Sequence, residues 1–151
     1  MRGWASGVTI VSACDGHDMH GMTVSSFTSV SLEPPLVLIC AERATRTNRL
    51  IEASGAFAVS VLAHGHQDLS DRFGGRDTEH LNRFEGVATI TAVTGAPILA
   101  EYVSYFDCVV SEAHPAGTHT IFVGKVVAAR LAVGGRSPLV YWRQAYHNLC
   151  S

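Results

Sequence analysis

Lysine is almost absent from this chain, and charged residues of both signs are sparse. The 151 residues include 11 Lys and Arg, of which only Lys125 is a lysine, against 13 Asp and Glu, so the formal net charge is −2. Proteins that bind nucleic acid through its phosphates need a concentrated basic face. The composition therefore argues against nucleic acid as the main partner.

The chain also lacks a long apolar run and a clustered set of cysteines. Its longest purely apolar stretch covers residues 36–41, far short of the roughly 20 residues that a membrane-spanning helix needs. The cysteines form no C-x-x-C motif, which predicts buried or free thiols in a reducing compartment rather than disulfides or a zinc site. The N-terminal apolar run alternates like a strand, so we expect a cytoplasmic protein without a signal peptide. The four cysteines are Cys14, Cys40, Cys108 and Cys150.

Hydrophobic residues make up 47% of the chain, and their short runs have the length and composition of β-strands. Runs rich in Val, Ile, Thr and Phe alternate with turn-forming residues, a pattern typical of an antiparallel sheet or barrel. The pair Asp15-Gly16 predicts a hairpin between the first two strands. We expect strands at residues 7–14, 22–32, 36–41, 57–62, 87–93, 102–112 and 120–131.

Only short helices are predicted between these strands. The segment "TNRLIEASG" has Thr47 as a plausible N-cap and Gly55 at the position of a left-handed terminating residue. The segment "HQDLSDRFGG" predicts a second helix closed by two glycines, and "TEHLNRF" predicts one or two further turns. No internal repeat or linker is present, so residues 1–151 are expected to form a single domain, mainly β with small helical insertions.

One predicted strand, within "HGMTVSSFTSVSLEPPLVLIC", carries an unusual number of hydroxyl side chains. Alternation places Thr23, Ser25, Phe27, Ser29 and Ser31 on one face. A solvated face of an exposed strand is one interpretation. A second interpretation is a wall that lets a flat ligand such as a flavin ring approach the backbone closely. Small hydroxyls in place of Lys, Glu and Arg favour this second interpretation.

Basic residues gather around the start of the first predicted helix, in "ERATRTNRL". Unpaired backbone N–H groups and the helix dipole favour an anion at such a place, and arginine adds charge-assisted hydrogen bonds to phosphate. The alternative is a capped helix with a basic, solvated first turn. Arginine has the wrong sign for the dipole at a helix N-terminus, which favours the anion ligand.

Six segments, taken together and in order, resemble the short-chain flavin reductase family. They are "GVTIVSA", "GMTVSSFTSVSLEPPLVLIC", "TRTNRLIEASGAFAVSVL", "LSDRFGG", "HTIFVGKVV" and "PLVYWRQAYHNL". These reductases are the small components of two-component flavin-dependent monooxygenases. The resemblance implies a split β-barrel that forms a homodimer, reduces FMN or FAD with NADH or NADPH, and supplies diffusible reduced flavin to a monooxygenase component.

The resemblance also implies roles for individual residues. The isoalloxazine ring would lie against Thr23, Val24, Ser25 and Ser26, the ribityl chain along Cys40, Ala41 and Glu42, and the phosphate at Thr45, Arg46 and Thr47. Arg72 and Phe73 would approach the flavin or the nicotinamide. The family commonly has Gly-Asp-His before the "TIFVG" strand, whereas this chain has Thr118 before His119, so an acidic partner for the histidine is missing.

Other chemistry-bearing residues leave alternatives open. His119 is the candidate that positions the nicotinamide or the flavin edge, although a histidine that opens a strand is commonly a turn residue. The C-terminal group Tyr141, Trp142, Arg143 and Tyr146 either closes the pocket or belongs to the core or a subunit interface. The pairs His17/His20 and His64/His66 have no neighbours spaced to complete a metal site, so no metal is expected.

Two other functions remain possible on the sequence alone. One is a flavin-binding electron-transfer protein that does not turn over NAD(P)H. The other is a related split-barrel FMN oxidase that acts on a pyridoxamine phosphate-like substrate, because one fold hosts several chemistries. The lack of a Gly-rich dinucleotide fingerprint does not separate these functions from a reductase, since this family binds NADH without a Rossmann unit.

Overall fold

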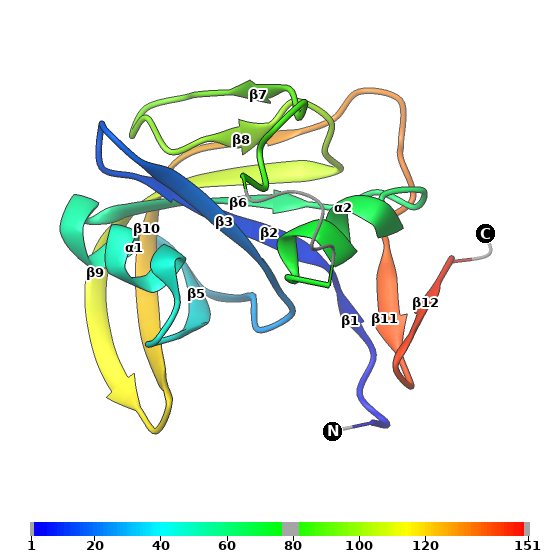
Figure 1. Ribbon diagram of the computed structural model, residues 1–151, viewed down its shortest axis with the longest axis horizontal. Helices are drawn as coiled ribbons and strands as arrows, with labels where there is room; N and C mark the ends of the chain where they lie inside the picture. The colour runs from blue at the N-terminus through cyan, green and yellow to red at the C-terminus, as the bar shows by residue number, and fades with distance from the viewer. Residues whose placement is uncertain (1, 77–81, 150–151) are drawn as a thin grey trace.

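The computed structural model describes residues 2–76 and 82–149, and its largest element is a seven-stranded antiparallel sheet (Figure 1). The strands stand in the order β3-β2-β6-β9-β10-β5-β4. Two smaller sheets join β1 to β11 and β12, and β7 to β8. The strands of the large sheet are β2 (Thr9–Cys14), β3 (Met19–Val24), β4 (Thr28–Leu32), β5 (Pro35–Glu42), β6 (Ala56–Val61), β9 (Ser104–Ala116) and β10 (His119–Leu131). The strands of the small sheets are β1 (Ser6–Gly7), β11 (Val140–Trp142), β12 (Ala145–His147), β7 (Thr89–Ile90) and β8 (Ile98–Leu99).

The two edge strands of the large sheet, β3 and β4, are consecutive in the chain. Only residues 25–27 separate them, and four Cα steps span at most about 15 Å. In a flat sheet of this order the two edges would lie roughly 29 Å apart, at the usual spacing between strands. The sheet must therefore curl until its edges approach each other. This is the predicted split barrel, with the split between β3 and β4.

Three of the predicted strands differ from the observed ones by more than the positions of their ends. The single strand predicted over 22–32 is two strands, because the chain leaves one sheet edge after Val24 and enters the other at Thr28. The strand predicted over 7–14 is also two, since β1 pairs with β11 and β2 pairs with β3 and β6.

The strand predicted over residues 87–93 is reduced to the two residues of β7. Beyond it, the backbone N–H groups of Val93 and Thr94 donate to the carboxylate of Asp107, at 2.7 and 2.9 Å, instead of to a neighbouring strand. Asp107 is fully buried. A buried carboxylate is stable only when hydrogen-bonded, and these donors hold the loop against β9.

In the described part of the chain, two short helices cover the barrel. Helix α1 (Arg46–Ser54) contacts β2, β3, β5 and β6, and α2 (Gln67–Phe73) contacts β2 and β3. The N-cap of α1 is Thr45, whose hydroxyl accepts the N–H of Asn48, so the prediction of Thr47 was wrong by two residues. Gly55 ends α1 in the left-handed conformation as predicted, with φ of 67°. Gly74 and Gly75 follow α2 as predicted, and the predicted "TEHLNRF" turn lies largely outside the described residues.

The main core fills the barrel between the large sheet and α1. Phe57, Phe122, Ile39, Ile51 and Leu50 are its largest buried side chains. Gly124, on β10, lets the ring of Phe57 pass over the backbone: a Cβ built there would lie 2.5 Å from Phe57 Cζ. A second apolar cluster lies under α2 and the C-terminal strands, around Ile10, Leu62, Phe73, Phe84 and Leu139.

Cys14, Cys40 and Cys108 are free, as predicted for the described part of the chain. Burial and the adjacent Asp107 carboxylate raise the pKa of the Cys108 thiol to about 12, which makes it unreactive. Within residues 2–76 and 82–149, no helix is long and apolar enough to cross a membrane. In the same residues no three His, Cys, Asp or Glu side chains are grouped so that they could hold a metal ion.

Candidate functional site

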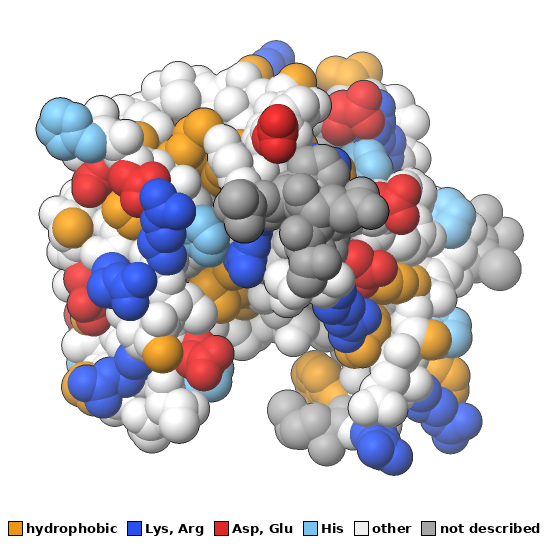
Figure 2. All heavy atoms as spheres, viewed as in Figure 1, with side chains coloured by type: hydrophobic (Ala, Val, Ile, Leu, Met, Phe, Trp, Pro, Cys, Tyr) orange, Lys and Arg blue, Asp and Glu red, His pale blue; other side chains and the backbone are white. Residues whose placement is uncertain are grey.

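The split in the barrel is where the hydroxyl-rich segment leaves β3. Thr23 Oγ1 donates to the carbonyl of Ser70 on α2 at 2.6 Å, while Ser25 is exposed beyond the end of the strand. An opening of about 200 Å³ begins here. Figure 2 shows the molecule hollowed between the lobe that ends in the β9–β10 hairpin and the lobe formed by β11 and β12. The lining residues of the opening are Val8, Thr23, Ser25, Ser70, Gly74, Arg76, Tyr141 and Tyr146.

Ser26 ties the β3–β4 connection to β5. Its Oγ donates to the carbonyl of Cys40 and accepts the N–H of the same residue, both at 3.1 Å. The predicted ring-binding and ribityl segments are thus adjacent in the structure. Val24 and Ala41 are 4% and 0% exposed as whole residues, so both belong to the core and neither offers appreciable surface to a ligand in this structure.

The turn that follows β5 is closed by Thr45. Its hydroxyl donates to the carbonyl of Glu42 at 2.7 Å and accepts the N–H of Asn48 at 3.2 Å. The N–H of Arg43 donates to the carbonyl of Thr118 at 2.9 Å, which fastens the turn to the start of β10. The ribityl and phosphate segments predicted from the sequence are therefore continuous along one side of the barrel.

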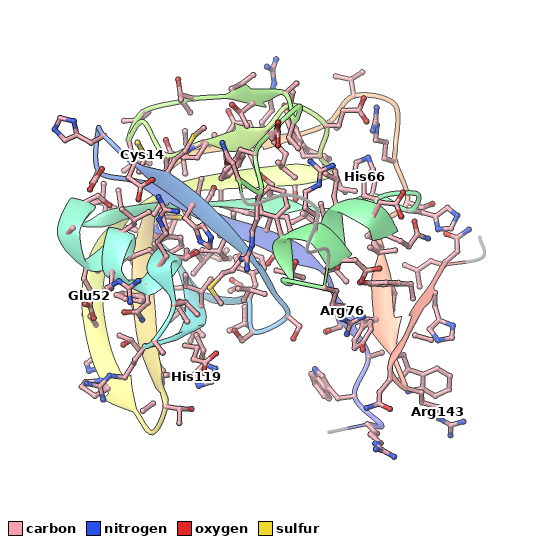
Figure 3. The ribbon with its side chains drawn as sticks, in the orientation of Figure 1. Cys14, Glu52, His66, Arg76, His119 and Arg143 are labelled. Atoms are coloured by element: carbon pink, nitrogen blue, oxygen red, sulfur yellow. The ribbon has the colours of Figure 1, made fainter. Side chains whose placement is uncertain are left out.

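His119 opens β10 directly opposite Glu42 in the β5–β10 ladder. The imidazole is exposed and borders the hollow (Figure 3). Its Nδ1 lies 2.9 Å from the hydroxyl of Thr118. Thr118 therefore contacts the imidazole at the place in the sequence where the family commonly has an acid, and it orients the ring without adding a charge.

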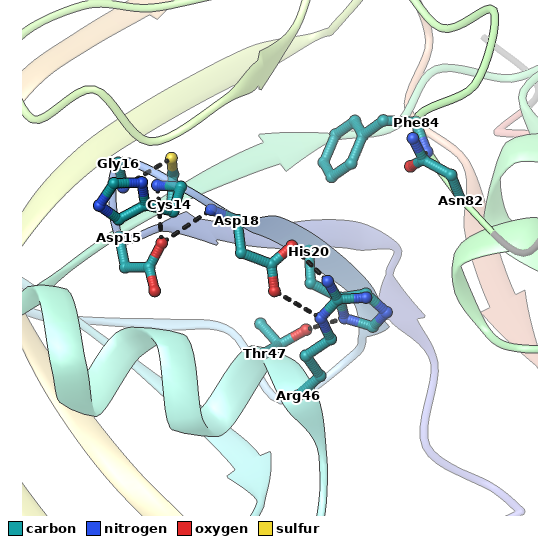
Figure 4. A network of polar contacts seen from close by, with 10 residues as sticks. Cys14, Asp15, Gly16, Asp18, His20, Arg46, Thr47, Asn82 and Phe84 are labelled. Carbon is teal, nitrogen blue, oxygen red and sulfur yellow. Dashed lines mark hydrogen bonds and ion pairs between the residues drawn. The ribbon is translucent and has the colours of Figure 1, made fainter.

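The basic first turn of α1 is already paired with a carboxylate. Arg46 Nε donates to Asp18 Oδ2 at 2.7 Å, and Arg46 Nη2 makes a second ion-pair contact with Asp18 Oδ1 (Figure 4). The hydroxyl of Thr47 is fully buried and lies 2.8 Å from His20 Nδ1. Asp18, from the β2–β3 hairpin, supplies a negative charge there, so the arginines at the start of α1 do not by themselves require an anion ligand.

His20 is neutral at ordinary pH because burial lowers its pKa to about 4, with the charges of Arg83 and Arg46 adding to the effect. An unfolded histidine titrates near pH 6.5, so the unfolded state binds more protons between pH 6.5 and 4. Stability is therefore lost as the pH falls through this range.

We expect His20→Asn, which retains a polar contact for Thr47, to remove this part of the acid sensitivity. The ring is about half buried, so solvent screening limits the difference to about 1–2 kcal/mol. Urea unfolding at pH 7 and at pH 5 measures it. An equal loss of stability on acidification in both proteins would contradict the assignment.

Arg72 and Phe73 are not placed with the other predicted residues. Phe73 is fully buried, with its ring edge-on to Phe84 at 4.9 Å, and so cannot contact a ligand in this structure. Arg72 donates to the carbonyl of Glu85 at 2.8 Å and borders a separate opening with His66 and Glu101. Ser70 lines the opening at the split, and Arg72 lies two positions after it on α2. The two side chains therefore point to different sides of the helix.

The C-terminal hairpin closes one side of the opening. The hydroxyl of Tyr146 donates to Asp71 Oδ1 at 2.7 Å and lies 2.8 Å from the hydroxyl oxygen of Ser70. The ring of Tyr141 lies 5.4 Å from that of Tyr146. Both tyrosines line the opening and also pack against the second apolar cluster, so for them the pocket and core interpretations hold together. Trp142 instead stacks under Arg143, whose guanidinium carbon lies 4.4 Å from the ring centroid.

Arg76 and Asp71 were not selected as site residues from the sequence. Arg76 Nη1 lies 3.3 Å from Asp71 Oδ1, and its Nη2 lies 3.5 Å from the Tyr141 hydroxyl. Figure 3 shows Arg76 between α2 and the C-terminal strands. Its place depends on the docking of the hairpin onto α2, which no local pattern encodes.

The similarity to known proteins extends over the whole described barrel. The model of the "Flavin reductase like domain" family matches residues 1–150. The reductase component of 4-hydroxyphenylacetate 3-monooxygenase from Thermus thermophilus is 37% identical, over 97% of this chain and 90% of its own. The actinorhodin polyketide dimerase of Streptomyces coelicolor is 39% identical, over 97% of this chain and 81% of its own.

Two solved structures are similar in fold as well as in sequence. The NADH:FAD oxidoreductase SgcE6 of Streptomyces globisporus, in complex with NAD and FAD fragments, has a TM-score of 0.88 and 32% identity, covering 98% of this chain and 87% of its own. The flavin reductase HpaC complexed with NADP+ has a TM-score of 0.87 and 30% identity, covering 99% of this chain and 93% of its own. With this match over nearly its full length, the chain belongs to the flavin reductase-like domain family.

Proposed function

We propose that this protein is an NAD(P)H:flavin reductase, built as one domain over residues 1–151, that supplies reduced flavin to a partner monooxygenase. The observation that carries the proposal is the exposed Ser25–Ser26 bend at the split of the barrel, held against β5 by the two hydrogen bonds between Ser26 and Cys40. The fold leaves small hydroxyl side chains and backbone groups uncovered at this point, next to a continuous turn that ends in a helix N-terminus.

The residues at the split fit a flavin. Thr23, Ser25 and Ser26 offer small polar groups to the ring, and the exposed residue Glu42 follows for the ribityl chain. The first turn of α1 has free N–H groups at its start and Arg46 on its surface, which suits a phosphate. FMN and FAD both carry these three parts, so the fit accommodates either one.

A flavin held there would supply the hydride-accepting ring for NADH or NADPH, and the protein's task would be to bring the two rings together in a reactive orientation. His119 lies at the edge of the hollow and is oriented by Thr118. We assign it the positioning of the nicotinamide or the flavin edge. Its proposed role needs no proton transfer, and Thr118 provides a neutral partner for the ring.

The wall formed by this chain is open on one side, because Ser25, Glu42 and His119 are all exposed. A second copy that covers this side would exclude water from the rings, and we propose that the protein works as a homodimer. Reduced flavin then leaves the site and diffuses to the monooxygenase component, which requires no docking surface between the two proteins.

The first test is NADH and NADPH oxidation at 340 nm by the purified protein, with and without added FMN or FAD. We expect oxidation that depends on added flavin, and the rates rank the flavins and the nicotinamides. Bound flavin without oxidation of either nicotinamide would instead indicate an electron-transfer protein. Amine oxidation by tightly held FMN without NADH would indicate a split-barrel oxidase.

A further inference from the structure

The carboxylate of Asp18 is paired with Arg46, the arginine that the proposed function assigns to the flavin phosphate. Asp18 lies at the β2–β3 hairpin, whereas Arg46 is the first residue of α1. The guanidinium meets both carboxylate oxygens through Nε and Nη2 (Figure 4). Paired Arg and carboxylate groups of this kind have the same two-pronged geometry as Arg with phosphate. One guanidinium edge cannot serve both acceptors.

The surroundings of this pair favour an anion. Helix α1 has no acidic residue in its first turn. Beyond burial, the charges that lower the pKa of the neighbouring His20 come from Arg83, Arg46 and Arg49, and the one that raises it comes from Asp18. Asp18 is therefore the carboxylate that offsets an otherwise positive cluster at the start of the helix.

The hairpin holds Asp18 by its backbone rather than by its side chain. Its N–H donates to Asp15 Oδ1 at 2.8 Å, and its carbonyl accepts the N–H of Asp15 at 3.1 Å. Among the described residues, the Asp18 carboxylate hydrogen-bonds only to Arg46. Arg46 and Asp18 are 49% and 38% exposed in their side chains, so the ion pair is weak and exchangeable.

We infer that Asp18 is a built-in competitor for the flavin phosphate: it holds the Arg46 guanidinium when the phosphate is absent and must release it when flavin binds. The inference rests on the proposed function and extends it. Each time flavin binds, the Asp18–Arg46 ion pair must break, and the Asp18 carboxylate is left near the flavin phosphate. The consequence is a lowered affinity for phosphorylated flavins, which suits a flavin that is released after reduction rather than one that stays bound.

Riboflavin and FMN test this inference directly, because they share the ring and ribityl chain and differ by the phosphate. We expect the Asp18→Asn variant to bind FMN about two- to fivefold more tightly than the unaltered protein, because FMN no longer has to break an exposed ion pair. Riboflavin affinity and kcat are expected to stay unchanged. Flavin fluorescence titration gives the affinities, and the gain in FMN affinity should shrink at high salt.

Two further variants complete the experiment. Asp68→Asn removes the same charge at an exposed site on α2 and should leave the FMN to riboflavin ratio unchanged. In an Arg46→Gln background, Asp18→Asn should no longer tighten FMN, since the competition is for the guanidinium.

An unchanged FMN affinity in Asp18→Asn, an equal gain for riboflavin, or a gain that persists without Arg46 would each overturn the inference. Failure of the proposed function is separate, because it appears as a lack of NAD(P)H-dependent flavin reduction by the unaltered protein.

Discussion

Gly124→Ala is expected to lower the free energy of unfolding by about 1–3 kcal/mol, the usual cost of overpacking a core. The added methyl group would lie 2.5 and 2.8 Å from the Phe57 ring and 2.9 Å from Cys108 Cβ. All three atoms belong to buried side chains, and both partners pack inside the main core, so neither can move into solvent. The gain in strand propensity of alanine over glycine is smaller than this penalty.

Urea unfolding of purified variants measures the effect, with Gly7→Ala as the matched control. Gly7 also lies in a strand, but a Cβ there meets no atom within 4 Å. Truncating the ring in Phe57→Leu should reduce the cost of Gly124→Ala in the double variant. If Gly124→Ala and Gly7→Ala were equally stable, the close approach of β10 to Phe57 would not exist.

Ser25→Leu is expected to raise the KM for flavin about tenfold or more, which corresponds to about 1.4 kcal/mol of lost binding. Ser25 lies in the lining of the opening at the split of the barrel. A leucine there fills space that the flat ring needs and removes a polar group from its wall. The hydroxyl is exposed, so the free energy of unfolding should change by no more than about 0.5 kcal/mol.

Ser29→Leu is the matched control for this substitution. Ser29 is an exposed serine in β4, three positions beyond Ser26, and it does not line the opening. Steady-state flavin reduction and thermal unfolding on both variants separate loss of binding from loss of fold. A KM for flavin that is unaltered in Ser25→Leu would remove the hydroxyl segment from the proposed site.

The barrel is predicted well because the sequence patterns that indicate its strands and turns are local and recur along the chain. Short β-branched runs, Asp15-Gly16 in a hairpin turn and Gly55 after a helix each have a strong conformational preference, and the structure agrees with them. The boundary inside residues 22–32 was missed because alternation continues through Ser25 and Ser26. Only the pairing of β3 and β4 with different strands reveals the break.

The candidate site is less accessible to such reasoning. The hydroxyl segment, the β5 turn and His119 were selected from the sequence, but the partner of each is set by tertiary contacts. Asp18, in the β2–β3 hairpin, meets Arg46 at the start of α1, and Tyr146 reaches Asp71 from 75 residues further along the chain. A fully buried Phe73 also could not be distinguished from an exposed one, since aromatic residues occur in cores and pockets alike.

The strand order has a consequence for how the chain folds. Strand β5 is held between β4 and β10, and β10 comes from the far end of the chain. Such a barrel has high contact order, because its closing pairs unite segments separated by much of the sequence. Domains of this kind fold on the order of milliseconds to seconds. During synthesis, one edge of β5 stays unpaired until β10 leaves the ribosome, so the side of the barrel that carries the proposed ribityl and phosphate turn is among the last parts to be secured.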